Sequence, residues 1–298
     1  MCHSYLILCV RYRLRLAGDR QSGRQQEVIV KSLCVQEGMA VESPGVNFSV
    51  DLQGRTVLVT GAGSGIGHSI AAVLAQAGAR VFINDVAAAR AQETAAVLHG
   101  EALPGDITNP DFLQTVQRLP IDILINNAGF QHVAPLEEFP PEIFRQMLEV
   151  MLVAPFLLAQ TVVPGMKARG FGRIINIASI HAKIASAYKS GYVSAKHGLL
   201  GLTRAVALEL APFGITVNAI CPGYVDTPLV RNQLSALAAA HHLDYEEDVI
   251  ETVILRNVPM KHLITPAEIA YLTLFLCSDA ARSITAQGYT VDAGLIQI

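Results

Sequence analysis

Short apolar segments alternate with longer segments of helical periodicity from residue 51 to the end of the chain. Apolar runs rich in β-branched residues, the pattern of buried strands, lie at 56–60, 80–84, 121–125, 173–178, 215–220 and 288–291. Helical patterns lie at about 66–77, 87–98, 110–118, 141–167, 190–211 and 266–278. Because this alternation is typical of a parallel sheet, we expect one doubly wound α/β domain over residues 51–298, with helices on both faces.

A glycine-rich turn joins the first predicted strand to the first predicted helix. It spans Gly61–Gly67 and reads Gly-Ala-Gly-Ser-Gly-Ile-Gly. Glycines allow the backbone to approach a pyrophosphate, and a helix N-terminus donates N–H groups to it. Strand, turn and helix in this order therefore predict a dinucleotide-binding loop, with a purely structural turn as the alternative.

A carboxylate ends the second predicted strand. Asp85 follows Gly67 by 18 residues, a position suited to accept a hydrogen bond from a ribose 2′-hydroxyl. No Arg or Lys lies beside Ser64 or directly after Asp85, so a 2′-phosphate would meet an unpaired carboxylate. We therefore predict NAD, rather than NADP, as the cofactor.

A segment of 18 residues concentrates groups that move protons. It contains Ser179, His181, Lys189, Tyr192 and Lys196. Tyr192 and Lys196 are four residues apart and so share one face of a predicted helix. Because an ammonium beside a phenol favours the phenolate, we expect Lys196 to lower the pKa of Tyr192. Such a tyrosine can exchange a proton with a carbonyl or alcohol oxygen.

Composition narrows the function further. The chain has 298 residues, 16% of them charged, and a net charge of −3 with no basic patch, so we expect a globular enzyme and no nucleic-acid partner. No apolar run reaches membrane-spanning length, so we expect no membrane contact. The five cysteines lack metal-ligand spacing, so we expect no metal; only two lie in the predicted domain, which indicates a reducing, cytoplasmic location.

Residues 1–50 differ from the rest of the chain. Positions 1–38 hold six Lys or Arg against three Asp or Glu, three of the five cysteines and no clear periodicity. We expect a poorly ordered extension that carries no chemistry, and we favour Met39 as the true start of the protein. A mitochondrial presequence is the alternative, because the segment is rich in Arg, although its acidic residues argue against it.

Several motifs occur in the order typical of one enzyme family: Thr60-Gly-x-x-x-Gly-x-Gly67, Asn126-Asn-Ala-Gly129, Ser179, Tyr192-x-x-x-Lys196 and Cys221-Pro-Gly223. With these motifs the chain resembles the short-chain dehydrogenase/reductase family from about residue 52 to the C-terminus. The resemblance implies a single Rossmann-type domain. It also implies hydride transfer between NAD(P) and a carbonyl/alcohol pair.

The resemblance assigns roles to individual residues. Ser179 would hydrogen-bond the substrate oxygen, Tyr192 would be the general acid/base, and Lys196 would hold the nicotinamide ribose and lower the pKa of the tyrosine. The cofactor would contact Gly61, Ser64, Gly65, Ile66, Gly67, Asp85, Asp106, Ile107, Asn127, Ala128, Gly129, Tyr192, Lys196, Pro222, Gly223, Val225 and Thr227.

Within the family, the chain is similar to bacterial D-3-hydroxybutyrate dehydrogenases over 126–132, 170–181 and 219–233. The similarity implies NAD-dependent interconversion of D-3-hydroxybutyrate, or a close short 3-hydroxy acid, and acetoacetate. Ser179 and Tyr192 would contact the reacting oxygen, and the substrate carboxylate would bind Gln131, His181, Lys189 and Gln233. A neutral sugar or polyol as the substrate is one alternative, and a weakly active or non-catalytic NAD-binding regulatory protein is another.

Three positions depart from the family pattern. Met151 stands where an Asn normally holds a water in a proton relay, and we expect slower turnover from this thioether. Tyr224 and Leu295 stand where those bacterial enzymes have two Trp, which loosens the expected pocket and admits a slightly longer acid. The third departure, Ala in Asp292-Ala-Gly294, is minor. The family also implies a substrate lid at about 224–260 and a homodimer or homotetramer.

Overall fold

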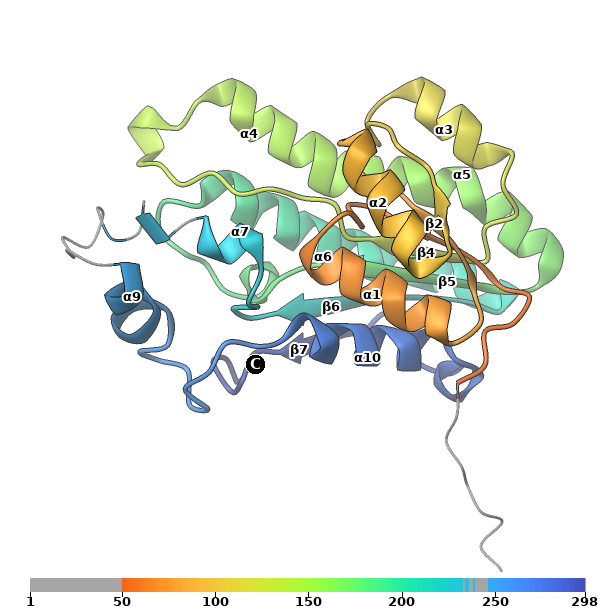
Figure 1. The fold of residues 1–298 in the computed structure, drawn as a ribbon. Coiled ribbons are helices and arrows are strands. Elements are labelled where there is room, and N and C mark those ends of the chain that lie inside the picture. The colour runs from red at the N-terminus through yellow and green to blue at the C-terminus, as the bar shows by residue number, and fades with distance from the viewer. Residues whose placement is uncertain (1–49, 233, 236–237, 239–245, 298) are drawn as a thin grey trace, which may run out of the picture. The chain divides into compact units, whose positions relative to one another are not determined.

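The computed structural model describes residues 50–232, 234–235, 238 and 246–297. All of them belong to one compact unit, Ser49–Ile298. The extension predicted for residues 1–50 lies outside the described residues, apart from Val50, and stays a prediction. Helices and strands alternate along the unit, as the sequence predicts (Figure 1).

Seven parallel strands form one sheet, in the order β3-β2-β1-β4-β5-β6-β7. Their bounds are Thr56–Val59 (β1), Arg80–Ile83 (β2), Glu101–Ala102 (β3), Ile123–Asn126 (β4), Gly172–Ile177 (β5), Ile215–Pro222 (β6) and Gly288–Val291 (β7). The predicted Rossmann-type fold and its six predicted strands are confirmed. β3 was not predicted, because two exposed residues are too few to show any periodicity.

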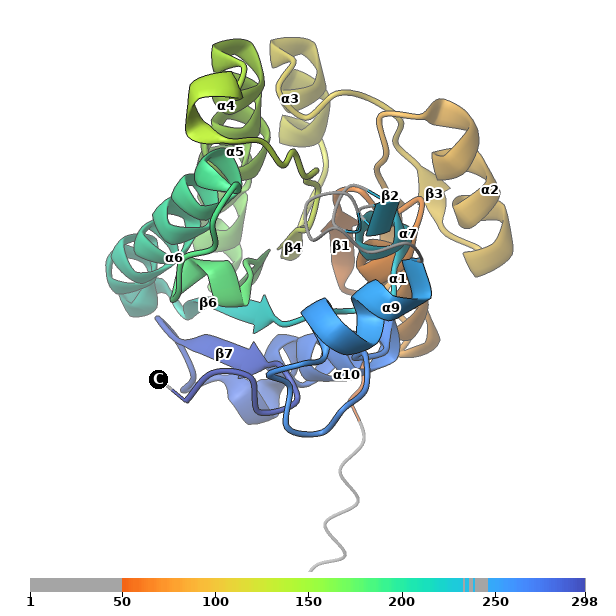
Figure 2. The ribbon, with the colours of Figure 1, turned by 90° about the vertical axis from the view of Figure 1, so that its left-hand side faces the viewer.

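Helices cover both faces of the sheet (Figures 1 and 2). Buried side chains place three helices on one face: Gly65–Gln76 (α1), Ala88–Leu98 (α2) and Pro266–Cys277 (α10). Three lie on the other: Pro110–Gln117 (α3), Ala154–Arg169 (α5) and Ser190–Leu210 (α6). Short 3₁₀ turns occupy Leu136–Glu138, Ile180–Ala182, Ala211–Phe213 and Asp279–Ala281.

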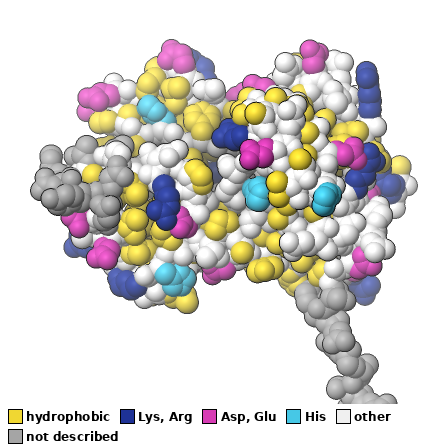
Figure 3. Space-filling model, in the orientation of Figure 1, with side chains coloured by type: hydrophobic (Ala, Val, Ile, Leu, Met, Phe, Trp, Pro, Cys, Tyr) yellow, Lys and Arg dark blue, Asp and Glu magenta, His cyan; other side chains and the backbone are white. Residues whose placement is uncertain are grey.

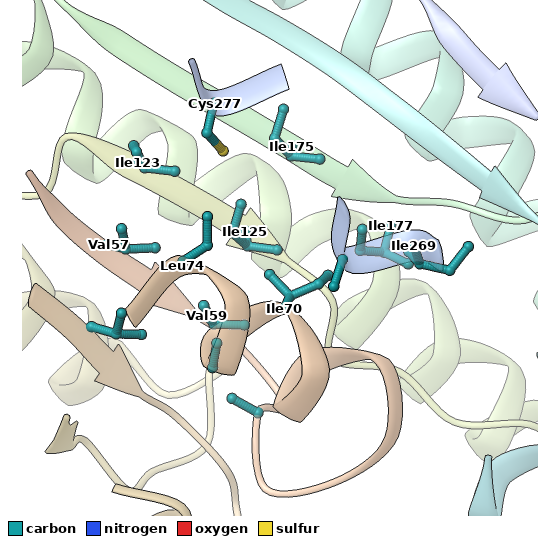
Figure 4. Packing of buried hydrophobic residues seen from close by; sticks show 14 of the residues in the cluster. Val57, Val59, Ile70, Leu74, Ile123, Ile125, Ile175, Ile177, Ile269 and Cys277 are labelled. Carbon is teal, nitrogen blue, oxygen red and sulfur yellow. The ribbon is translucent and has the colours of Figure 1, made fainter. Parts of the chain in front are cut away.

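Alternate residues of a strand pack into two separate hydrophobic cores, one on each face of the sheet. Val57 and Val59 of β1 pack with Ile70 and Leu74 of α1 (Figure 4), whereas Leu58 between them packs against the helices of the opposite face. All four residues of β1 are therefore buried, which explains why the strand reads as a continuous apolar run instead of an alternating one.

A long helical segment precedes β5. It consists of Pro141–Leu148 (α4), a π-helical turn at Glu149–Val153, and α5. By length and composition this segment is apolar enough to cross a membrane, the one such helix in the part of the chain that the structure describes. No membrane span was predicted, because polar residues interrupt the apolar run. Its residues Leu158 and Met166 nevertheless belong to the core under the sheet, so it packs as a core helix.

The segment predicted to form a lid, about residues 224–260 and here called the lid segment, links β6 to α10. Its described helices are Pro228–Arg231 (α7), Glu246–Val249 (α9) and a π-helical turn at Ile250–Ile254. α7 and α9 lie beyond the carboxyl ends of the strands, toward the left of Figure 1. Charges of both signs are scattered over the face of the molecule seen in Figure 3.

Buried polar side chains connect α6 to the centre of the sheet. Asn126 Nδ2 of β4 donates to Asn176 Oδ1 of β5 at 2.8 Å, and Asn176 Nδ2 donates to Thr203 Oγ1 of α6 at 2.8 Å. Thr203 is fully buried, so its hydroxyl has no water to replace a lost partner. This chain of bonds, here called the Asn126–Thr203 network, links α6 to β4 and β5.

We predict that Thr203→Val lowers the free energy of unfolding by about 1–3 kcal/mol, because it leaves the Asn176 amide unsatisfied at nearly unchanged side-chain volume. Urea denaturation measures the effect. Thr161→Val is the matched control, since the Thr161 hydroxyl bonds only to Leu157 O of its own helix. Equal losses in the two variants would contradict a special role for the network.

Candidate active site

The glycine turn is fixed to the neighbouring strand β4. Gly61 (φ +61°) and Gly65 (φ +55°) have left-handed backbones, and a Cβ added to Gly61 would lie 2.9 Å from Ala128 Cα. Thr60 Oγ1 accepts the backbone N–H groups of Asn127 and Ala128 at 2.9 and 3.1 Å. The Asn127 amide donates back to the carbonyls of Thr60 and Gly61. These bonds therefore fix the side of the turn that faces β4 and leave its other side accessible to a ligand.

Asp85 lies beside this turn and is paired. It is 5% exposed and accepts hydrogen bonds from the backbone N–H groups of Gly63 (3.2 Å) and Ala87 (2.9 Å). Arg90 Nη2 donates to it as well, at 3.1 Å. The expectation of an unpaired carboxylate is therefore wrong. Arg90 lies five residues along the chain, at the start of α2, and the folded helix brings it back to Asp85.

A cleft of about 460 Å³ opens over the glycine turn. It is lined by most of the predicted cofactor residues: Gly61, Ser64, Gly65, Ile66, Asp85, Asp106, Ile107, Asn127, Ala128, Gly129 and Thr227. Gly67 does not line it, because it packs beneath the turn against Gly61 and Asn127. Arg90, which was not predicted, lines the cleft with its half-exposed guanidinium.

A second, smaller cavity of about 120 Å³ adjoins this cleft, and residues such as Asn127 and Thr227 line both. The remaining predicted cofactor residues, Tyr192, Lys196, Pro222, Gly223 and Val225, line this cavity. So do the predicted substrate residues Gln131, Ser179, His181, Lys189 and Tyr192, whereas Gln233 lies outside the described residues. Below we call it the substrate cavity.

The predicted proton-transfer group comes from two elements. Ser179 follows the end of β5, and Tyr192 and Lys196 lie in the first turns of α6. Lys196 Nζ donates to Ile177 O at 2.7 Å and lies 5.6 Å from the centroid of the Tyr192 ring. The three side chains that were predicted to act together therefore meet in one cavity.

The pKa of Tyr192 differs from the expectation. It is raised, because burial disfavours the phenolate, and the hydrogen bond with Ser179 only partly opposes this. Burial also lowers the pKa of Lys196 to about 8. The predicted net lowering of the tyrosine pKa is therefore wrong for the protein by itself, because sequence spacing places the ammonium near the phenol but does not reveal how deeply both are enclosed.

Lys189 is a buried cation without a counter-ion. It is 7% exposed, and no described residue forms a hydrogen bond or ion pair with its ammonium. Burial lowers its pKa. His181 is equally buried, its Nδ1 has no partner among the described residues, and burial together with Lys189 lowers its pKa to about 4. Among the residues that the structure describes, no Asp or Glu lines the cavity, and its titratable side chains include two lysines and a neutral histidine.

Of the residues that depart from the family pattern, some line the substrate cavity and others do not. Met151 lines the cavity from the π-helical turn that joins α4 to α5, and its thioether lies against Gly129. Tyr224 also lines the cavity, whereas Leu295 does not. Unpredicted lining residues include Ile180 after β5 and three from the lid segment, Leu229, Val230 and Ile254. No motif marks these apolar residues, since they reach the cavity only through folding of the lid segment.

Comparisons with known proteins show the family of this chain. A family model described as Enoyl-(Acyl carrier protein) reductase matches residues 61–296. An uncharacterized oxidoreductase of Bacillus subtilis is 47% identical over 251 residues, 80% of this chain and 97% of its own. A D-beta-hydroxybutyrate dehydrogenase of Rhizobium meliloti is 42% identical over 253 residues, 80% and 98% of the two chains.

Solved structures show the same fold. An actinorhodin polyketide ketoreductase with NADPH has a TM-score of 0.76 at 32% identity, with 81% of this chain and 97% of that chain covered. A putative gluconate dehydrogenase from Agrobacterium tumefaciens has a TM-score of 0.74 at 32% identity, with 83% and 98% covered. The names of these similar proteins point to several substrate classes. The substrate of this chain must therefore be inferred from its own site.

We predict that Met151→Asn raises kcat by up to about tenfold, a fraction of what a positioned proton transfer contributes, because an amide can hold a water that a thioether cannot. The measurement is steady-state turnover across pH. Met151→Leu is the control: it keeps the volume and the apolar character and should leave kcat unchanged. An unchanged kcat across pH in Met151→Asn would remove the idea that the relay limits turnover.

Proposed function

The chain belongs to the short-chain dehydrogenase/reductase family, and we propose that it interconverts D-3-hydroxybutyrate, or a close short 3-hydroxy acid, and the corresponding 3-oxo acid with NAD. One observation carries the choice of substrate: Lys189 is buried without a counter-ion in the same small cavity as Ser179 and Tyr192. A buried cation is costly unless an anion compensates it. The 42% identity to a D-beta-hydroxybutyrate dehydrogenase supports an acid of this kind.

The larger cleft fits a dinucleotide. The backbone N–H groups at the start of α1 suit its pyrophosphate, and Asp85, fixed by Gly63 and Ala87, suits a ribose hydroxyl. When bound, NAD supplies the acceptor for the hydride that leaves the alcohol carbon. Two backbone donors hold Asp85 in place, so a 2′-phosphate would meet its carboxylate as well as Arg90, and the like charge of Asp85 supports NAD.

The proposed chemistry assigns one step to each polar side chain. Ser179 holds the substrate hydroxyl, and Tyr192 accepts its proton during oxidation or donates a proton to the carbonyl oxygen during reduction. Lys196 is the cation that stabilises the phenolate form of Tyr192. Burial keeps competing water out of the cavity and strengthens these interactions.

The substrate carboxylate would bind at the other polar side chains of the cavity. Lys189 supplies the charge, and Gln131 and neutral His181 supply uncharged donors. Fixing the carboxylate and the reacting oxygen at the same time orients so small a molecule for transfer. A neutral sugar or polyol would leave Lys189 unpaired, and a purely regulatory NAD-binding protein would have no use for the Ser179/Tyr192/Lys196 group.

We predict that Lys189→Ala raises the KM for acetoacetate by about tenfold or more while kcat changes less, since a charge-assisted hydrogen bond is lost. Gln131→Ala should raise the KM by a smaller factor. The assay is NADH consumption at fixed pH. Lys183→Ala is the matched control, because Lys183 lies on the same loop but donates to Thr290 and does not line the cavity. An unchanged KM in both test variants would overturn the carboxylate assignment.

A separate prediction concerns the cofactor. Asp85→Asn should lower the preference for NAD over NADP, measured as the ratio of kcat/KM values, by about tenfold or more, because it removes a like charge beside the 2′-phosphate. Arg90, released from its ion pair, would then face that phosphate. Adding Arg90→Ala to Asp85→Asn should therefore reverse the gain in NADP activity. A ratio that stays constant in Asp85→Asn would show that Asp85 does not set the preference.

A further inference from the structure

The substrate cavity has an apolar side that the proposed chemistry does not use. Tyr224, Val230 and Ile254 of the lid segment form this side, which unlike Lys189 and the proton-transfer group is mainly apolar. A cavity with a cation and an apolar wall suits an amphiphilic molecule, with its carboxylate and its alkyl end bound at different places. The apolar wall therefore bears on which acid the protein accepts.

Ile254 is the firmly held part of this wall. It is 2% exposed, ends the π-helical turn Ile250–Ile254, and packs in an apolar cluster with Leu234 and Val249. The turn is closed by a 2.8 Å hydrogen bond from Leu255 N to Ile250 O. A side chain that is packed from behind and faces a cavity cannot retreat without cost, so it limits how long a ligand can be.

We propose that Ile254 determines the chain length of the acid by closing the space available to its alkyl end. This inference rests on the proposed function, since it takes the ligand to be a 3-hydroxy acid held at Lys189. On this proposal, an acid with a one-carbon alkyl end would lie against Ile254, and each further methylene would meet its side chain. One methylene in an apolar pocket changes kcat/KM by about 10–200-fold, so a single residue is enough to set the preference.

The experiment compares oxidation of D-3-hydroxybutyrate, D-3-hydroxypentanoate and D-3-hydroxyhexanoate with NAD. In Ile254→Ala we expect kcat/KM for the six-carbon acid, relative to that for the four-carbon acid, to rise about tenfold or more. Ile250→Ala is the matched control: it makes the same deletion in the same π-helical turn and the same cluster but does not line the cavity. Its ratio should equal that of the unmodified protein.

Two outcomes overturn the inference: a ratio in Ile254→Ala equal to that of the unmodified protein, or an equal shift in Ile250→Ala. Ile254→Val, which removes one methylene from the wall, keeps the test valid if the alanine variant does not fold, and should shift the ratio in the same direction. If the unmodified protein oxidises none of the three acids, the proposed function fails. Oxidation of all three with no effect of Ile254→Ala leaves the proposed function standing and removes only this inference.

Discussion

The Asn126–Thr203 network is the constraint on which the site depends. β4 leads into Asn127, which holds the glycine turn, and β5 leads into Ser179, while α6 carries Tyr192 and Lys196. These groups sit on three different elements, so their mutual distances follow from how the elements are fixed to one another. Buried hydrogen bonds are directional, so the bonds from Asn126 to Asn176 and from Asn176 to Thr203 restrict how these elements can shift, although Asn126 Oδ1 has no partner among the described residues.

In the proposed function, the charge of Lys189 is what makes the cavity selective for an acid. Lys196 offsets part of its burial by donating to Ile177 O, but Lys189 has no such partner among the described residues. Lys189 is therefore a largely buried cation that faces the cavity without an ion pair among the described residues, and the burial of His181 lowers the pKa of that side chain to about 4. Burial of an unpaired cation lowers the stability of the free protein, and an anion that binds there regains that free energy. The proposal of an acid as the substrate therefore rests on the site and not on the fold.

Sequence patterns predicted those features that depend on neighbours along the chain. β1 was predicted almost to the residue because both of its faces are buried, and the glycine turn because strand, turn and helix are contiguous. β3, the pairing of Arg90 with Asp85 and the raised pKa of Tyr192 were missed, since each depends on the folded surroundings. Ile254 could not be predicted either, because no local pattern distinguishes a cavity wall from an ordinary core residue.

The π-helical turn at Met151 places an apolar side chain beside Tyr192, which bears on whether the proposed reaction favours reduction or oxidation. It divides one long helix into α4, whose Met147 packs in the same cluster as Tyr192, and α5, whose Leu158 packs under the sheet. Met151 lies at this change of partner and presents an apolar group to the cavity beside the phenol. An apolar neighbour disfavours the phenolate. In the proposed carbonyl reduction the phenol begins as the proton donor, which this environment favours. In the proposed alcohol oxidation it must first lose its proton, and Lys196 is the cation proposed to favour this loss.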